Sequence, residues 1–130
     1  MYLVDTSVWI QVFRKSVNFN ISKVIPFDDI VTALPILQEV LQGCRDERAY
    51  RIAYESMVSL PMVDSPMPQE RVIEAILLYR TARKTGLTVR SSIDCLIAAS
   101  AMRHNLTVLH IDRDFSVLAK VSSLKERVLP

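Results

Sequence analysis

Short apolar segments alternate along this chain with longer segments of helical periodicity, and this alternation limits the fold more than any other feature. Strands are predicted at residues 2–4, 30–32 and 107–111, with weaker edge strands at 61–64 and 128–129. A strand that is apolar throughout is typical of a parallel sheet with both faces buried. The sequence therefore predicts an α/β fold, a three-layer α/β/α sandwich with a central, mostly parallel sheet.

Helices are predicted in the intervals between these strands. Pro35 suits the first turn of one helix, Gly43 is a natural end for it, and Ser91 and Ser92 precede another. The predicted helices span about residues 8–15, 35–42, 46–60, 69–84, 93–104 and 115–119. In the third of these, the spacing predicts that the inward face consists of Ala49, Ile52, Ala53, Ser56 and Leu60.

The length and composition fit one soluble domain. The chain has 130 residues, half of them apolar, so residues 1–130 are predicted to form a single domain with a substantial core. A formal net charge of +2 is low for a protein that coats nucleic acid through bulk charge. It remains compatible with an acidic pocket inside a basic rim, because the two contributions cancel in the sum.

Location and redox state are predicted from the same sequence. The N-terminus lacks the pattern of a signal peptide and no apolar run has the length of a membrane span, which predicts a cytoplasmic protein without membrane contact. Cys44 and Cys95 have no partner at motif spacing, so both are predicted to be reduced thiols in or near the core.

Two carboxylates directly follow predicted strands. Asp5 comes after the first strand and Asp112 after the strand at 107–111. In an open parallel sheet, ligands bind outside the carboxyl ends of the strands, so the two acids would meet if their strands are neighbours. The alternatives are local: Asp5 is also a good helix N-cap, Asp112 a good turn residue, and for Asp114 the N-cap of the last helix is favoured.

Asp94 and Glu39 lie within predicted helices. The neighbours of Asp94 on its helix face are Ile97, Ala98 and Ala101, so a carboxylate begins a face that is otherwise apolar. Such a group requires a cation, strong hydrogen bonds or a favourable place in the first helical turn. Glu39 borders an apolar face as well, but periodicity alone does not distinguish it from other glutamates of the chain.

Carboxylates gathered in one pocket favour a hard divalent cation. Mg²⁺ and Mn²⁺ take oxygen ligands, and they support the hydrolysis of phosphodiesters. A zinc site is not indicated, because His104 and His110 have no Cys or His partner at ligand spacing. Both histidines are predicted to be surface or cap residues.

Four segments together resemble the PIN-domain family. They are Leu3–Trp9, Thr32–Gly43, Ser92–Ala99 and Leu109–Phe115, and they occur in the order of the family and span nearly the whole chain. The short single-domain form is most similar to the VapC-type toxins of toxin–antitoxin systems. The resemblance implies a PIN-like parallel sheet covered by helices and an endoribonuclease that hydrolyses RNA.

The resemblance also implies the roles of individual residues. It assigns the acidic catalytic cluster to Asp5, Glu39, Asp94 and Asp112, and one or two Mg²⁺ or Mn²⁺ ions to that cluster. Asp5, Asp94 and Asp112 would be metal ligands. Ser7 matches a polar position that helps to order the site, and Asp114 matches a more variable acidic position of supporting importance.

Partners follow from the same resemblance. It implies an RNA substrate, a homodimer and a cognate antitoxin, whose groove would lie around Trp9, Phe13 and the helix at 46–60. Arg14, Arg90 and Arg113 are candidates for contacts with RNA phosphates, although arginines are more often simply solvated surface residues.

Other classes fit the residues less well. Haloacid-dehalogenase phosphatases need a second aspartate two residues after the first, where this chain has Ser7, and phospho-receiver domains need an acidic pair at that point. A PIN-like module that binds RNA or protein without cutting stays open as an alternative. The sequence does not reveal which RNA is cut or how many ions are bound.

Overall fold

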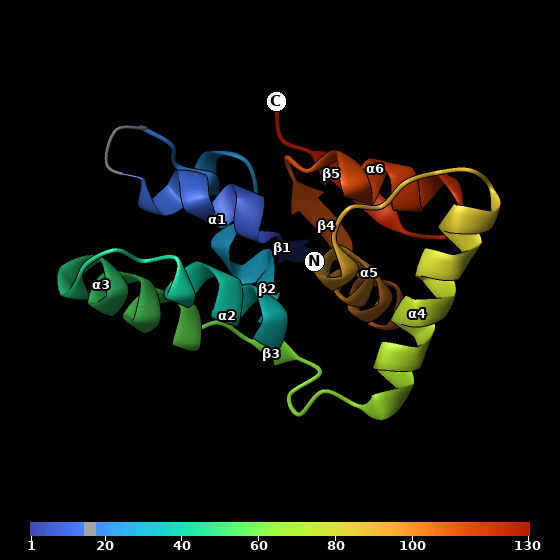
Figure 1. Ribbon diagram of the computed structural model, residues 1–130. Coiled ribbons are helices and arrows are strands. Elements are labelled where there is room, and N and C mark those ends of the chain that lie inside the picture. Colours follow the sequence, from blue (N-terminus) through green and yellow to red (C-terminus); the bar gives the residue numbers. More distant parts are fainter. Residues whose placement is uncertain (15–17) are drawn as a thin grey trace.

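All strands of the described chain join one parallel sheet. The structure is a computed structural model that describes residues 1–14 and 18–130. The strand order is β3 (Met62–Val63), β2 (Ile30–Ala33), β1 (Tyr2–Val4), β4 (Thr107–His110) and β5 (Lys125–Val128), and every pairing is parallel. The first strand of the chain therefore lies at the centre of the sheet, and the predicted parallel sheet is confirmed (Figure 1).

Helices connect the strands and flank the sheet. In Figure 1, the first three helices lie toward β2 and β3, and the last three toward β4 and β5. Two short 3₁₀ turns, Ile21–Lys23 and Phe27–Asp29, precede β2. The helices are α1 (Thr6–Phe13), α2 (Leu34–Gln42), α3 (Glu47–Val58), α4 (Gln69–Lys84), α5 (Ser92–Arg103) and α6 (Arg113–Lys120).

The core forms where the central strands meet the buried face of α5. Leu3 of β1 and Leu109 of β4 are fully buried, as are Ile97 and Ala98 of α5. Close packing of these side chains fixes α5 against the sheet, and so fixes the position of its first turn. Cys44 is half-buried and Cys95 is buried, and both thiols are free, as predicted.

The predicted element bounds differ from the observed ones at several places. The first helix begins at Thr6 rather than at residue 8, because Asp5 caps it. Its predicted end at Lys15 lies outside the described residues. The last strand spans the polar segment 125–128, which its two-residue prediction at 128–129 covers only in part.

The predicted inward face of the third helix was partly wrong. Ala53 and Leu60 are buried, but Ile52 is half exposed and Ser56 is exposed, while Met57 is buried instead. The helix carries apolar residues on more than one side, so periodicity alone did not determine its rotation. Within the described residues, no helix combines the length and apolar character needed to cross a membrane.

Candidate metal centre

The candidate site lies at the carboxyl ends of the two central strands. Asp5 follows β1 directly, and its backbone N–H donates to the carbonyl oxygen of Leu109 in β4 at 2.9 Å. Because β1 and β4 are parallel neighbours, the chain after β4 leaves the sheet beside Asp5. The predicted adjacency of these two strand ends is therefore confirmed.

Asp5 is buried and held by Ser7. Its Oδ2 accepts hydrogen bonds from the Ser7 backbone N–H at 3.0 Å and from the Ser7 hydroxyl at 2.6 Å. The Ser7 Oγ in turn accepts from the backbone N–H of Ile111 at 3.0 Å. Ser7 thus connects the acid after β1 to the segment after β4, and Asp5 serves as the N-cap of α1 as well as lying in the site.

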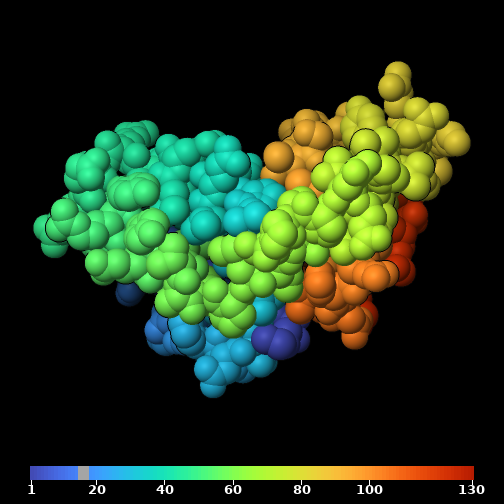
Figure 2. All heavy atoms as spheres, turned by 90° about the horizontal axis from the view of Figure 1, so that it is seen from below, coloured from blue at the N-terminus to red at the C-terminus, as the bar shows by residue number. Residues whose placement is uncertain are grey.

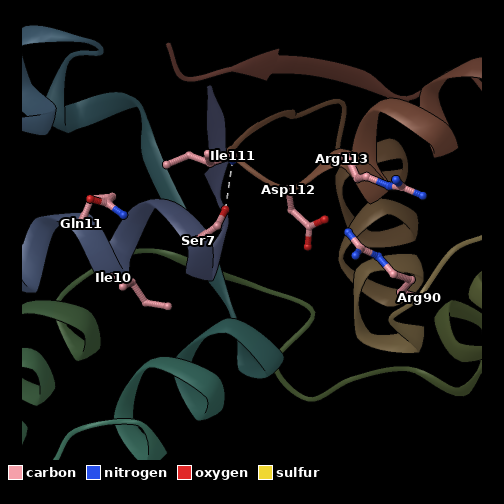
Figure 3. Close-up of a pocket in the computed structure, with 7 residues that line it drawn as sticks. All are labelled: Ser7, Ile10, Gln11, Arg90, Ile111, Asp112 and Arg113. Carbon is pink, nitrogen blue, oxygen red and sulfur yellow. Dashed lines mark hydrogen bonds between the residues drawn. The ribbon is translucent and has the colours of Figure 1, made fainter.

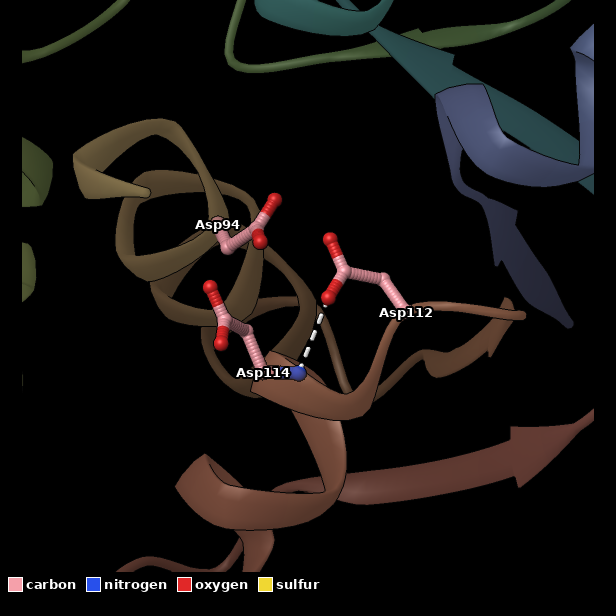
Figure 4. Close-up of side chains that lie close together, drawn as sticks. All are labelled: Asp94, Asp112 and Asp114. Carbon is pink, nitrogen blue, oxygen red and sulfur yellow. Dashed lines mark hydrogen bonds between the residues drawn. The ribbon is translucent and has the colours of Figure 1, made fainter. Parts of the chain in front are cut away.

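Three carboxylates gather between the start of α5 and the start of α6. Asp94, Asp112 and Asp114 each offer an oxygen that lies within 4.8 Å of the others (Figure 4). Asp94 and Asp114 are 5% and 1% exposed, and Asp112 is half-buried. Among the described residues, no other group of three potential metal ligands comes this close together.

Asp112, and not Asp114, caps the last helix. The Asp112 Oδ1 accepts from the Asp114 backbone N–H at 2.9 Å. The favoured interpretation of Asp114 as the N-cap was therefore wrong. Its Oδ2 instead accepts from the backbone N–H groups of Arg90 and Ser91 at 3.0 and 3.1 Å, which ties the start of α6 to the start of α5.

Two carboxylate oxygens in this group are buried without a hydrogen-bond partner among the described residues. They are Asp94 Oδ2 and Asp114 Oδ1, which accept no hydrogen bond from the described residues. An unpaired buried carboxylate is costly, and a bound cation would remove that cost. A donor set made of carboxylate oxygens alone fits a hard divalent ion such as Mg²⁺ or Mn²⁺.

Burial, and to a lesser extent the proximity of other acids, raises the pKa values of Asp94 and Asp5. Burial raises the pKa of Asp94 to about 9, with further contributions from a hydrogen bond to Asp112 and from the charges of Asp112, Asp5 and Asp114. Burial also raises the pKa of Asp5, although the hydrogen bonds from Ser7 and the Thr6 backbone oppose this and the charge of Asp112 adds to it. Both shifts have the same physical cause, because removal from water and nearby negative charges each disfavour the ionised carboxylate.

Glu39 lies at the edge of the site rather than among the three clustered carboxylates. It is half-buried on α2, and its Oε1 accepts from the hydroxyl of Thr6 in α1 at 2.9 Å. The Thr6 contact was not expected from the sequence, since nothing in the local pattern pairs residues 33 positions apart. It fixes α2 to the first turn of α1, next to Asp5.

A pocket of about 580 Å³ opens beside the acids. Figure 3 shows the guanidinium groups of Arg90 and Arg113 near each other, both on the same side of the Asp112 carboxylate. Arg14 is exposed at the end of α1 and does not line this pocket. The lining residues are Ser7, Ile10, Gln11, Arg90, Ile111, Asp112 and Arg113.

The histidines do not belong to the site. His104 is the C-cap of α5, as predicted, and its Nε2 lies 3.0 Å from Asp64 Oδ1. His110 is 1% exposed and pairs with Glu126, so its predicted surface location was wrong. Its place in β4 explains the difference, because successive residues of this strand are buried on both faces of the sheet.

Comparisons with known proteins agree on one family and one fold. Residues 2–121 match the family model described as PIN domain. The chain is 33% identical to ribonuclease VapC11 of Mycobacterium tuberculosis over 136 aligned positions, which cover 96% of each chain.

Solved structures with the same fold extend this comparison from sequence to three-dimensional structure. VapBC2 from Rickettsia felis, bound to a DNA fragment from its promoter, matches 99% of this chain and 98% of its own with a TM-score of 0.79 at 15% identity. The sarcin–ricin-loop-cleaving toxin VapC20 of M. tuberculosis matches 95% of this chain and 98% of its own with a TM-score of 0.70 at 17% identity. At these identities the structural matches establish the fold.

Proposed function

The chain belongs to the PIN-domain family, and we propose that it is a metal-dependent endoribonuclease that forms the toxin half of a toxin–antitoxin pair. The observation that carries this proposal is the convergence of Asp94, Asp112 and Asp114 at the end of the parallel sheet. The ribonuclease VapC11, similar over nearly its whole length, supports RNA as the substrate.

The cation would be held by carboxylates from three separate elements. Asp94 comes from the first turn of α5, Asp112 from the loop after β4, and Asp5 from the end of β1. We assign Mg²⁺ or Mn²⁺ to them, because the donors are all hard oxygen atoms. When bound, such an ion lowers the pKa of water and offsets charge on the phosphodiester.

Asp114 receives a larger role in this assignment than its position in the sequence suggested. Its Oδ1 is buried, accepts no hydrogen bond from the described residues and lies close to Asp94 and Asp112. Its Oδ2 is already engaged by two backbone N–H groups, so Asp114 positions the start of α5 and also faces the cation. Glu39, held by Thr6, would orient a water molecule at the rim of the site.

RNA would approach through the pocket beside the acids. Arg90 is largely exposed, with its Nε 3.8 Å from Asp114 Oδ1, and Arg113 lies near it on the same side of Asp112 (Figure 3). We assign both to contacts with the phosphates that flank the cleaved bond. Arg14, farther along α1, would contact the RNA outside the pocket.

A cognate antitoxin would bind over α3 and the adjoining part of α1. The outward apolar residues there are Ile10, Tyr50, Ile52, Tyr54 and Val58, each 41–50% exposed. Trp9, which the sequence placed in this groove, is 4% exposed and belongs to the core. In a binding titration, Ile52→Glu should therefore weaken affinity for the antitoxin, whereas changes at Trp9 that preserve folding should not.

The enzyme itself is proposed to be a homodimer.

The decisive experiment is the cleavage of a mixed RNA pool by purified protein free of antitoxin. Mg²⁺ or Mn²⁺ should support cutting, EDTA should stop it, and Asp5→Asn and Asp94→Asn should each abolish it. Asp28→Asn, which changes an exposed acid outside the site, is the matched control. If folded, partner-free protein cuts no RNA with either metal, a module that binds without cutting becomes the better assignment.

A further inference from the structure

The pocket beside the acids has two ends of different character. Arg90 and Arg113 line one end, and both are exposed. Figure 3 shows the side chains of the other end across the Asp112 carboxylate from these arginines, and none of them carries a charge. They are Ile10, Gln11 and Ile111. A molecule that fills the pocket therefore meets cationic groups at one end and uncharged groups at the other.

The uncharged end is built on one face of α1. Ile10 and Gln11 follow Ser7 by three and four residues, the spacing that places helix side chains on the same face. The Ser7 hydroxyl donates to Asp5 at 2.6 Å and accepts from the backbone N–H of Ile111 at 3.0 Å. The second hydrogen bond fixes Ile111 beside α1. The walls of this end are therefore positioned by the same contacts that order the first acid of the site.

We propose that this end of the pocket binds the base of a nucleotide next to the cleaved bond, and that Gln11 recognises the edge of that base. Phosphates pair with arginines, so the backbone belongs at the other end of the pocket. A base is uncharged, with apolar faces and a hydrogen-bonding edge. Ile10 and Ile111, 49% and 44% exposed, offer apolar contact to its faces. The half-buried amide of Gln11 offers a hydrogen-bond donor and an acceptor to its edge.

The spacing along α1 suits a single nucleotide. Ser7 and Gln11 are about one helical turn apart, roughly 5.4 Å along the helix axis. Ser7 is at the acids, since it holds Asp5. A nucleotide with its phosphate at the acids can therefore bring its own base to Gln11 across its sugar.

Adenine is the base that we expect Gln11 to prefer. A glutamine amide forms two hydrogen bonds with adenine, in which Oε1 accepts from the N6 amino group and Nε2 donates to N7. Guanine offers two acceptors at the same edge, N7 and O6, so the amide oxygen finds no donor there. Unpaired bases of single-stranded RNA expose this edge to a protein. The subsite therefore fits an adenine in a single-stranded segment.

The inference rests on the nuclease proposed above and adds a base preference to it. Figure 2 shows the green atoms of α3 at one end of the molecule, and the yellow atoms at the end of α4, from which the chain leads to Arg90, toward the opposite end. Ile10 belongs both to the base subsite and to the surface on α1 and α3 proposed for the antitoxin. The tests therefore have to distinguish recognition of a base from contact with that protein.

The first test maps the cut sites in a randomised single-stranded RNA library. The wild type should favour adenine at one fixed position beside the cut. Gln11→Ala should lower the ratio of cleavage rates for adenine over the other bases at that position by roughly 5- to 100-fold, the range for a two-bond base contact. Gln69→Ala, which changes an exposed glutamine at the first residue of α4, is the matched control and should keep the wild-type ratio. A Gln11→Ala variant that keeps the full preference would overturn the proposal, and one that also binds the antitoxin more weakly would assign Gln11 to that partner.

The second test measures binding without cleavage, by fluorescence anisotropy in EDTA. The probes are labelled oligouridines with and without one central adenine. Wild-type protein should bind the adenine-containing probe more tightly, and Gln11→Ala should bind both equally. Gln11→Glu should instead favour a probe with a central cytosine, whose N4 amino group donates to a carboxylate. Equal wild-type affinities would reject the base subsite even in an active nuclease. An adenine preference in protein that cuts no RNA would support the subsite and reject the nuclease assignment.

Discussion

Asp94 has an oxygen, Oδ2, that is buried and accepts no hydrogen bond from the described part of the chain. Burial, the hydrogen bond to Asp112 and the neighbouring acidic charges together raise the pKa of Asp94 to about 9. A carboxyl group with this pKa holds its proton at neutral pH when no cation is present. Cation binding must displace that proton, so affinity for the cation should increase with pH.

The stability of the metal-free protein should accordingly decrease as the pH rises. The folded protein binds the Asp94 proton more tightly than the unfolded chain, in which the pKa is near 3.8. The resulting stabilisation is complete below that value and is lost as the pH rises through about 9. Urea unfolding in EDTA across this range measures it, and Asp94→Asn should flatten the pH dependence. Asp28→Asn is the control and should show the same change in unfolding free energy with pH as the wild type. If Asp94→Asn shows that same change as well, Asp94 is not its source.

Ser7 offers a sharper comparison, because the chain contains the same local motif elsewhere. Ser22 donates its backbone N–H and hydroxyl to Asn20 Oδ1 at 3.0 and 2.6 Å, the same distances as for Ser7 and Asp5. Of the two serines, only Ser7 accepts a further hydrogen bond within the described residues, from the backbone N–H of Ile111 after β4. Ser7→Ala should lower Mn²⁺ affinity and RNA cleavage by roughly 10- to 100-fold, as for other residues that orient metal ligands.

Ser22→Ala is the control for that experiment, since it removes the same local hydrogen bonds at an exposed position. It should leave calorimetric Mn²⁺ titrations and cleavage rates unchanged. Similar losses in both variants would mean that Ser7 acts only as a local helix-start residue.

Single residues were predictable from sequence where the determining contacts are local. Asp5 and Asp94 were identified as candidates because each breaks an apolar pattern of its own element. Asp114 was misassigned because its hydrogen-bond donors lie at Arg90 and Ser91, more than 20 positions away. The burial of His110 depends on the strand that pairs beside it, which the histidine's own neighbours do not reveal.

Between elements, a buried ion cluster joins the start of α4 to the end of α5. Arg71, 3% exposed, donates to Asp64 at 2.9 Å and to Glu74 at 2.6 Å, and Asp64 also contacts His104. Burial would raise the pKa of Asp64, but the hydrogen bonds from Arg71, His104 and Ser100 and the charge of Arg71 overcome it and lower the pKa to about 2. The cluster thus fixes α4 in position against α5.

Arg71→Ala should therefore lower the free energy of unfolding by about 3–5 kcal/mol, because it leaves the Asp64 charge buried without its main partner. Arg83→Ala, on the exposed side of the same helix, should change it by no more than about 0.5 kcal/mol. Chemical denaturation at neutral pH measures both. A loss in Arg71→Ala no greater than that of Arg83→Ala would show that the cluster is not a significant source of stability.

The same cluster predicts the behaviour of the protein in acid. The pKa of Asp64 is lowered in the folded state, so its contribution is present above the unfolded value of 3.8 and is lost as the pH falls through about 2. Asp64→Asn should lower stability at neutral pH and remove this part of the acid sensitivity, as followed by circular dichroism. An unchanged acid midpoint in that variant would assign the sensitivity to other carboxylates.

Whole elements were predictable where their pattern of apolar residues is distinctive. The central strands were located because they are apolar throughout. By contrast, β5 contains Lys125, Glu126 and Arg127, so its pairing depends on backbone hydrogen bonds to β4 rather than on an apolar sequence. The rotation of α3 was missed for the opposite reason, an excess of apolar residues around the helix.

For the whole molecule, the order of the strands makes the two ends of the chain interdependent. β1 pairs with β2 on one side and with β4 on the other, so no part of the sheet is complete without residues from both ends. Length and composition predicted a single domain, but they did not predict which strands are neighbours, since that depends on how the connecting helices cross.

A single domain should unfold in one cooperative transition. Trp9 is the only tryptophan and is 4% exposed near β1, so its fluorescence reports on the N-terminal part of the core. Its urea transition should coincide with that of far-ultraviolet circular dichroism, which averages over all helices. Leu109→Ala in β4 should lower the free energy of unfolding by about 2–5 kcal/mol, and the two methods should report the same loss. Separate midpoints would indicate two units in place of one.

The central place of β1 also has a consequence for protein synthesis. Asp5 is synthesised well before its partners, so it can meet them only after Thr107–His110 and Asp112 have been translated and released from the exit tunnel. The nascent chain therefore cannot assemble the acidic centre until β4 and the residues that directly follow it have been synthesised. Cleavage at the acidic centre is therefore impossible for a nascent chain in which β4 has not yet been made.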